Sequence, residues 1–127
     1  MLKPVLDKIK NDSQGAIVGI GGTITTLAAM DLKLVQYDGR KVHGHILTRN
    51  MVATLLDTCM KAGVKGCRHL PGLPEDRADI IVAGMRIVLL IMSYLKKEDL
   101  VVSETGLLYG LARGMGEKVE IKNVIYY

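Results

Sequence analysis

A short apolar segment at residues 16–20 sets the first limit on the fold. It reads Ala-Ile-Val-Gly-Ile, it is rich in β-branched residues, and Gly21 and Gly22 end it. A run without polar alternation is typical of a strand buried on both faces. Residues 100–103 form a second segment of this kind. We therefore expect two parallel strands joined through a helical crossover, which defines an α/β fold.

The segments before, between and after the two strands have apolar residues at helical spacing. The predicted helices are 2–10, 23–32 with Thr23 as N-cap, 49–62 after the N-cap Thr48, a long helix to about 97 with Pro74 in its first turn, and 106–113. Residues 35–47 and 63–72 are rich in turn residues and predict connections. The run 80–95 is apolar except for Arg86. A membrane span needs about twenty uncharged apolar residues, so we expect a buried helix instead.

The length of 127 residues predicts a single domain over 1–127. A hydrophobic content of 49% suffices for one core, which must be aliphatic because Trp and Phe are absent. Residues 118–127 alternate in character and predict an extended tail or edge strand. Two strands make a poor sheet alone. We therefore expect either self-association or a further part of the sheet that is not in this chain.

The net charge and the cysteine content limit which ligands the protein is expected to bind and in which cell compartment we expect it. The formal net charge is +4, which favours anionic ligands. The basic residues are scattered and are not interleaved with aromatic residues, so nucleic acid is not an expected partner. The two cysteines and the absence of a signal-peptide pattern at the N-terminus predict a cytoplasmic protein, and we expect no membrane association.

The candidate binding site is the glycine-rich turn between the first strand and the helix after it. Its candidate residues are Gly19, Gly21, Gly22, Thr23 and Thr25. Glycines let backbone N–H groups approach a ligand, the helix N-terminus favours an anion, and the threonines add hydroxyl groups. The other reading is a tight turn that needs glycine for its backbone conformation and close packing. The turn matches neither a dinucleotide fingerprint nor a Walker loop.

A metal site is not expected. His43, His45 and His69 together with Cys59 and Cys67 supply donor atoms, but their spacing matches no zinc pattern. A structural use of these side chains is the preferred reading.

Two charged residues are secondary candidates. Arg86 could reach a phosphate, or it could lay its stem on apolar surface with its charge in water, which is more common. Glu104 follows the second strand at the end where α/β folds place ligand-facing residues, although a solvated loop acid is the simpler reading. No catalytic triad or paired carboxylates stand out in the sequence.

Several segments in order resemble the C-terminal part of the exopolyphosphatase / guanosine pentaphosphate phosphohydrolase (Ppx/GppA) family. The segments are 18–23, 25–31, 37–38 with 42–48, 70–73, 77–84, 100–103, 106–107 and 110–111. Together they span roughly residues 5 to 112, and their order makes the resemblance specific although each segment alone is weak.

The resemblance implies part of an actin-like ATPase (ribonuclease-H-like) domain, the second of two around a cleft. It implies release of terminal phosphate from polyphosphate or guanosine pentaphosphate with a divalent metal, usually Mg²⁺. It places the turn from Gly19 to Thr23 at the cleft. The family's two phosphate-binding loops and its N-terminal-domain glutamate have no counterpart here, and Glu104 and Thr105 depart from the pairs common in relatives.

Three functions follow as hypotheses. The first is a portion of such a phosphohydrolase that is inactive alone and carries no cofactor of its own. The second is a small module that binds polyphosphate or guanosine nucleotide without turnover. The third is an interaction subunit that pairs through an exposed sheet edge. Binding of phosphate compounds would separate the first two, and a concentration-dependent size would mark the third.

Overall fold

The computed structural model describes residues 3–12 and 15–116. Its elements are α1 (Lys3–Asp12), β1 (Ile17–Ile20), α2 (Gly22–Asp31), α3 (Gly39–Val42), β2 (Ile46–Thr48), α4 (Arg49–Cys67), a 3₁₀ turn (Glu75–Arg77), α5 (Ala78–Tyr94), β3 (Asp99–Ser103) and α6 (Leu107–Gly116). The predicted tail at 118–127 lies outside the described residues.

The three strands form one mixed sheet in the order β1-β3-β2. β1 pairs with β3 in parallel, with Val18 opposite Val101. β2 pairs with the other edge of β3 in the antiparallel direction, with Ile46 opposite Val101. The α/β fold and the parallel pair expected from the sequence are therefore confirmed. The third strand was not predicted, because it is only three residues long, at the end of the turn-rich stretch 35–47 and directly before α4.

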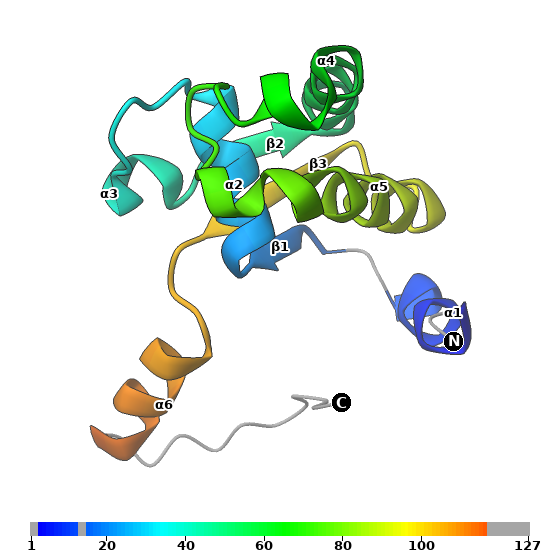
Figure 1. Ribbon diagram of the computed structural model, residues 1–127. Helices are drawn as coiled ribbons and strands as arrows, with labels where there is room; N and C mark the ends of the chain where they lie inside the picture. Colours follow the sequence, from blue (N-terminus) through cyan, green and yellow to red (C-terminus); the bar gives the residue numbers. More distant parts are fainter. Residues whose placement is uncertain (1–2, 13–14, 117–127) are drawn as a thin grey trace.

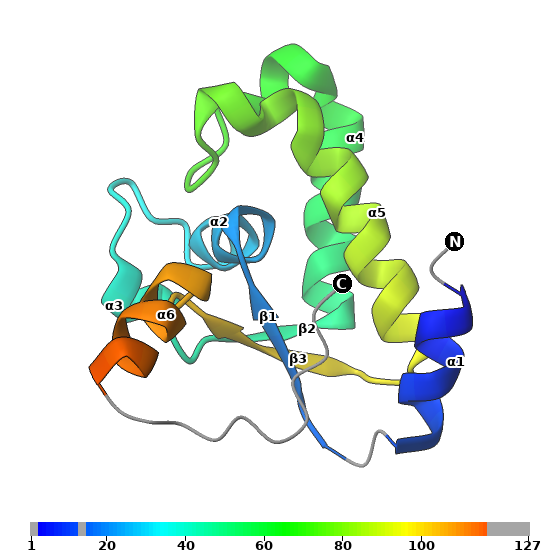
Figure 2. The same ribbon diagram turned by 90° about the horizontal axis from the view of Figure 1, so that it is seen from below.

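Helices α2, α4 and α5 form a layer on one face of this sheet (Figure 1). The view from below shows α2 lying over the strands, with α4 and α5 running side by side next to it (Figure 2). The fully buried side chains of this layer include Leu27 of α2, Val52 of α4 and Met85 of α5. They meet Leu47 and Val102 of the sheet, so a single aliphatic core holds the two layers together.

The opposite face of the sheet is exposed in the part of the chain that the structure describes. Val18, Val101 and Ile46 lie next to one another across the three strands. Val18 is 59% exposed and Ile46 is 51% exposed. The prediction that β1 is buried on both faces is therefore wrong, because in the described residues the layer of α2, α4 and α5 covers one face of the sheet.

Helix α5 is long, as predicted, but it is not buried all round. Ile81, Met85 and Val88 face the core, whereas Ile80, Ile87 and Leu90 are each more than half exposed. The helix begins later than predicted, because Pro74 precedes a 3₁₀ turn and α5 starts at Ala78. An apolar sequence shows that a helix can be buried. Which of its sides are actually buried depends on the elements that pack against it.

Helix α4 runs past its predicted end at residue 62. Gly63 has a φ of 66°, which interrupts the helix, and helical structure then resumes as far as Cys67. A glycine tolerates this left-handed conformation better than other residues. The predicted connection at 63–72 is thus partly helical.

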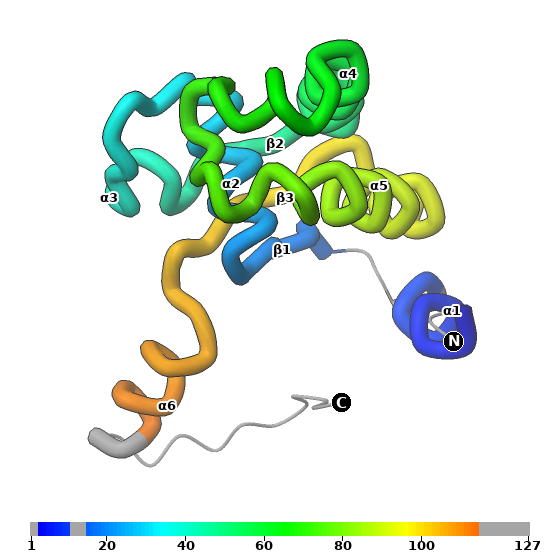
Figure 3. The backbone as a smooth tube through the Cα atoms, viewed as in Figure 1, coloured from blue at the N-terminus to red at the C-terminus, as the bar shows by residue number. Residues whose placement is uncertain are grey.

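Helix α6 extends away from the three-helix layer, whereas α1 lies beside the C-terminal end of α5 (Figures 2 and 3). The Oη of Tyr94 in α5 donates a hydrogen bond to Asp7 of α1. Helix α6 follows β3, and its large apolar side chains Leu107, Leu108, Tyr109 and Leu111 are all more than half exposed. Within the described residues, no helix is both long enough and apolar enough to cross a membrane.

Candidate functional site

The site is built on the N-terminus of α2. Gly21 is its N-cap residue, with a φ of 90° that glycine adopts at little cost. The backbone N–H of Thr25 donates the first bond of the helix to the carbonyl oxygen of Gly21, at 3.1 Å. The N–H groups of Gly22, Thr23 and Ile24 therefore have no partner within the helix. Such groups, together with the helix dipole, attract an anion.

The other predicted residues of the turn have different places. Gly19 belongs to the core, since a methyl group on it would lie 2.6 Å from Leu100 Cδ1 and 2.8 Å from Ile24 Cγ2. It permits close packing of strand against helix.

The two threonines also differ. Thr23 is not the N-cap that the sequence predicted, because the helix starts one residue before it. Its side chain faces Gly84 of α5, where an added methyl group would lie 2.6 Å from Thr23 Cγ2. Thr25 lies beside the turn, and its hydroxyl donates to the carbonyl oxygen of Gly21 at 3.3 Å. The structure thus brings Gly21, Gly22 and Thr25 together.

Arg77 contacts the turn from the other side. A methyl group built on Gly22 would come within 2.0 Å of Arg77 Nη1, so the guanidinium lies directly against this glycine. Leu73 is 93% buried in the core, and the N–H of Arg77 donates to the carbonyl oxygen of Pro74 at 3.0 Å. The hydrogen bond to Pro74 fixes the backbone of Arg77 in the 3₁₀ turn. The arrangement puts a permanent positive charge beside free backbone donors.

Glu104 and Tyr37 form the far side of the site. The Oη of Tyr37 donates a hydrogen bond to Glu104 Oε2. The N–H of Glu104 donates to His43 Nδ1 at 3.2 Å. Burial, and then the hydrogen bond to Glu104, raise the pKa of Tyr37, so the phenol stays protonated at neutral pH. Glu104 is therefore held at the end of β3 as a hydrogen-bond acceptor.

Thr25, Arg77, Tyr37 and Glu104 line one hollow of about 320 Å³ beside the turn. Its lining residues are Thr25, Thr26, Tyr37, Gly72, Pro74, Arg77 and Glu104. Of the residues proposed from the sequence, Thr25 and Glu104 are in this lining, whereas Arg77 and Tyr37 were not proposed as site residues. Arg77 lies in a segment that resembles the family, and that position was the only signal that could have pointed to it.

The remaining sequence candidates lie elsewhere. Arg86 Nη2 lies 3.8 Å from the sulfur of Met60 in α4, along the exposed side of α5. His45 Nε2 lies 2.8 Å from Asp31 Oδ2, and Cys59 and Cys67 are buried against each other. Among the described residues, no group of three or more His, Cys, Asp or Glu side chains gathers as metal ligands would.

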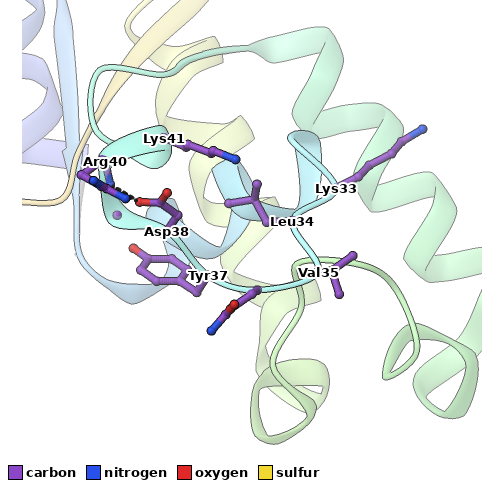
Figure 4. A pocket seen from close by; sticks show the side chains of 9 residues that line it. Lys33, Leu34, Val35, Tyr37, Asp38, Arg40 and Lys41 are labelled. Carbon is purple, nitrogen blue, oxygen red and sulfur yellow. Dashed lines mark hydrogen bonds and ion pairs between the residues drawn. The ribbon is translucent and has the colours of Figure 1, made fainter.

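A larger open pocket of about 690 Å³ adjoins the site and shares Tyr37 with it. One continuous segment, residues 33–41, forms it (Figure 4). The charge of Arg40 is offset by Asp38, whose pKa is lowered by the hydrogen bond from the Arg40 side chain. Lys33 and Lys41 add positive charge at the rim. We place the site at the smaller hollow, because separate elements converge there.

The sequence of this chain is similar to that of a known protein family. The model of the Ppx/GppA phosphatase family matches residues 1–118. Exopolyphosphatase 2 of Mycobacterium tuberculosis is 31% identical over 118 residues, which cover 87% of this chain and 36% of that protein. A bifunctional 3-dehydroquinate synthase/phosphatase of Fusobacterium nucleatum is 32% identical over 95 residues, which cover 75% of this chain and 14% of that protein.

Solved structures agree with the sequence comparison. The crystal structure of the Aquifex aeolicus member of the Ppx/GppA protein family matches 89% of this chain and 38% of its own, with 32% identity and a TM-score of 0.76. An exopolyphosphatase from Cytophaga hutchinsonii has the same fold over 96% of this chain and 40% of its own, with a TM-score of 0.76 and 21% identity. The chain thus spans less than half of each of these proteins.

Proposed function

This chain belongs to the Ppx/GppA phosphatase family, and we propose that it carries one wall of a phosphate-binding site in a polyphosphate or guanosine pentaphosphate phosphohydrolase. The family predicted from the sequence is confirmed, and the fold is part of the actin-like domain of its members. The observation that supports the proposal most is the contact between Arg77 and Gly22 at the start of α2.

The proposed ligand is the terminal phosphate of a chain of phosphates. Its oxygens would accept hydrogen bonds from the N–H groups of Gly22 and Thr23 and from the guanidinium of Arg77. The hydroxyl of Thr25 lies beside them. Tyr37 donates to Glu104, which keeps that carboxylate oriented on the far side of the hollow. These residues bind and orient phosphate, and the net charge of +4 adds to the attraction.

Turnover requires groups that we do not find in this set. Hydrolysis of a phosphoanhydride needs a positioned base for water and, in this family, Mg²⁺. Glu104 is the one carboxylate in the lining of the hollow and already accepts a hydrogen bond from Tyr37. Mg²⁺ is usually held by one or two carboxylates together with the phosphates of the substrate, and this lining offers Glu104 alone. We therefore propose that the chain is inactive by itself.

Calorimetric titration with tripolyphosphate and with guanosine pentaphosphate tests this function. We expect saturable binding of one ligand per chain, weakened by added salt because charge dominates the contact. Phosphate release in the presence of Mg²⁺ should stay at the level of a protein-free control. Measurable turnover would contradict the proposed inactivity, and absence of binding would contradict the site.

A second function is favoured by the exposed apolar row Val18, Val101 and Ile46. An edge strand with an uncovered apolar face invites another sheet or another copy of the chain. The interaction would be self-association, or docking with a further portion of the same domain. This function and phosphate binding are compatible, because the row and the turn are separate.

Sedimentation velocity of Val18→Lys tests self-association. The native chain is expected to gain mass with concentration, and the lysine should shift it to a monomer, because a charge cannot be buried in an apolar contact. Val35→Lys is the matched control, since Val35 is 101% exposed in the 33–41 segment. A native chain that stays monomeric at every concentration would contradict self-association.

A further inference from the structure

Two cysteine side chains in α4 lie in direct contact. Cys59 and Cys67 are each only 1% exposed. The thiol of Cys67 donates a hydrogen bond to the sulfur of Cys59, and the two sulfur atoms are 2.9 Å apart. Both are free thiols. The phosphate site uses neither of them, and their contact sets them apart from cysteines that only fill a core.

The kink at Gly63 creates this contact. In a straight α-helix, residues eight positions apart are separated by a rise of about 12 Å. Here Gly63, with φ of 66° and ψ of 175°, interrupts the helix midway between the two cysteines. The turn that follows folds back and brings Cys67 against Cys59. A left-handed backbone conformation at one glycine therefore produces a dithiol within one short stretch of chain.

We propose that Cys59 and Cys67 form a reversible intramolecular disulfide when the protein meets a peroxide. One thiolate attacks a peroxide oxygen, the O–O bond breaks, and the sulfur becomes a sulfenic acid while one water is released. The second sulfur then attacks the sulfenic sulfur, the S–S bond forms, and the S–O bond breaks to release a second water. A dithiol reductant reverses the reaction by thiol–disulfide exchange.

The surroundings of the pair make opening of the kink a necessary step. Burial, followed by the neighbouring Cys67, raises the pKa of Cys59 to about 12, so the closed form holds little thiolate. Met60 and Val64, which lie between the two cysteines in the sequence, are each more than half exposed. Transient separation of the segment 63–67 would expose the thiols, and reclosure would place the sulfenic acid beside its partner.

Intact-mass measurement tests the proposal on the full chain. The reduced protein is treated with hydrogen peroxide, then unfolded and alkylated with a maleimide. We expect a product lighter by two hydrogen atoms that takes up no maleimide, and dithiothreitol should restore both thiols. The oxidised form should melt at a temperature higher by roughly 5–10 °C, because the bond constrains a short loop of the unfolded chain. Two alkylated thiols, a sulfinic acid or a disulfide between chains would each overturn the proposal.

Gly63→Ala tests the role of the kink, with Gly44→Ala as matched control. Both glycines have positive φ, at 66° and 80°, and both have open space where the methyl group would lie. Alanine is strained at a positive φ in both places, but only Gly63 lies between the cysteines. The disulfide should form roughly tenfold more slowly in Gly63→Ala than in Gly44→Ala, because alanine disfavours the left-handed conformation. Equal rates in the two variants would overturn the role of the kink.

Discussion

Replacing Gly72 by alanine is expected to lower the free energy of unfolding by about 3 kcal/mol or more. Gly72 has a φ of 82°, which costs alanine about 1–2 kcal/mol. The new methyl group would also lie 2.3 Å from the carbonyl oxygen of Ala29 and 2.5 Å from the backbone nitrogen of Met30. Backbone atoms inside a buried helix cannot move aside as a side chain can, so both costs apply.

Urea unfolding of Gly72→Ala and of Gly44→Ala measures the difference. Gly44 also has a positive φ, but no atom lies within 4 Å of the position of its added methyl group. The control is therefore expected to lose only the backbone part, about 1–2 kcal/mol. Equal losses in the two variants would contradict the close contact between Gly72 and α2. Because Gly72 also lines the phosphate hollow, Gly72→Ala should weaken tripolyphosphate binding as well.

Gly22→Val is expected to reduce the affinity for tripolyphosphate by roughly 100-fold or more. The valine side chain would displace the Arg77 guanidinium, whose Nη1 lies 2.0 Å from the added Cβ position, and would block the N–H groups at the start of α2. The affinity falls because the phosphate loses two or more charge-assisted hydrogen bonds to the protein. Arginine has a long, flexible side chain and Arg77 is only partly buried, so the variant should still fold.

Calorimetric titration of Gly22→Val is compared with that of Gly15→Val. Gly15 precedes β1, at the end of that strand away from the turn, and has open space around it. The control should bind as tightly as the native chain. A melting temperature of Gly22→Val within a few degrees of the native value establishes that the fold is retained. Unchanged affinity in that folded variant would contradict the assignment of the phosphate site to this turn.

Local sequence patterns predicted most of the elements. The apolar segments at 16–20 and 100–103 became β1 and β3 in parallel, because a run of β-branched residues between helices has few other stable arrangements. Gly21 and Gly22 predicted the turn, although α2 begins at Gly22 and not after Thr23. Family membership was also readable, since several weak segments occurred in the right order.

The site itself was predicted only in part. The turn and Glu104 stood out because glycine and a strand-end acid have local signals. Arg77 and Tyr37 did not, because a charge in a short 3₁₀ turn and a tyrosine in a loop look like ordinary surface residues. Their approach to Gly22 and Glu104 depends on how the segments 33–41 and 72–77 pack against α2.

The amino-acid order thus determined which segments are helical or extended and where glycine permits a turn, since these follow from preferences within a few residues. Tertiary structure alone decided the third strand, the covered and exposed faces of β1 and α5, and the contact of Cys59 with Cys67. Those features depend on groups that are distant along the chain or on one backbone angle, as at Gly63. Local preferences allow several ways of packing the same helices and strands, and the tertiary contacts decide which of them forms.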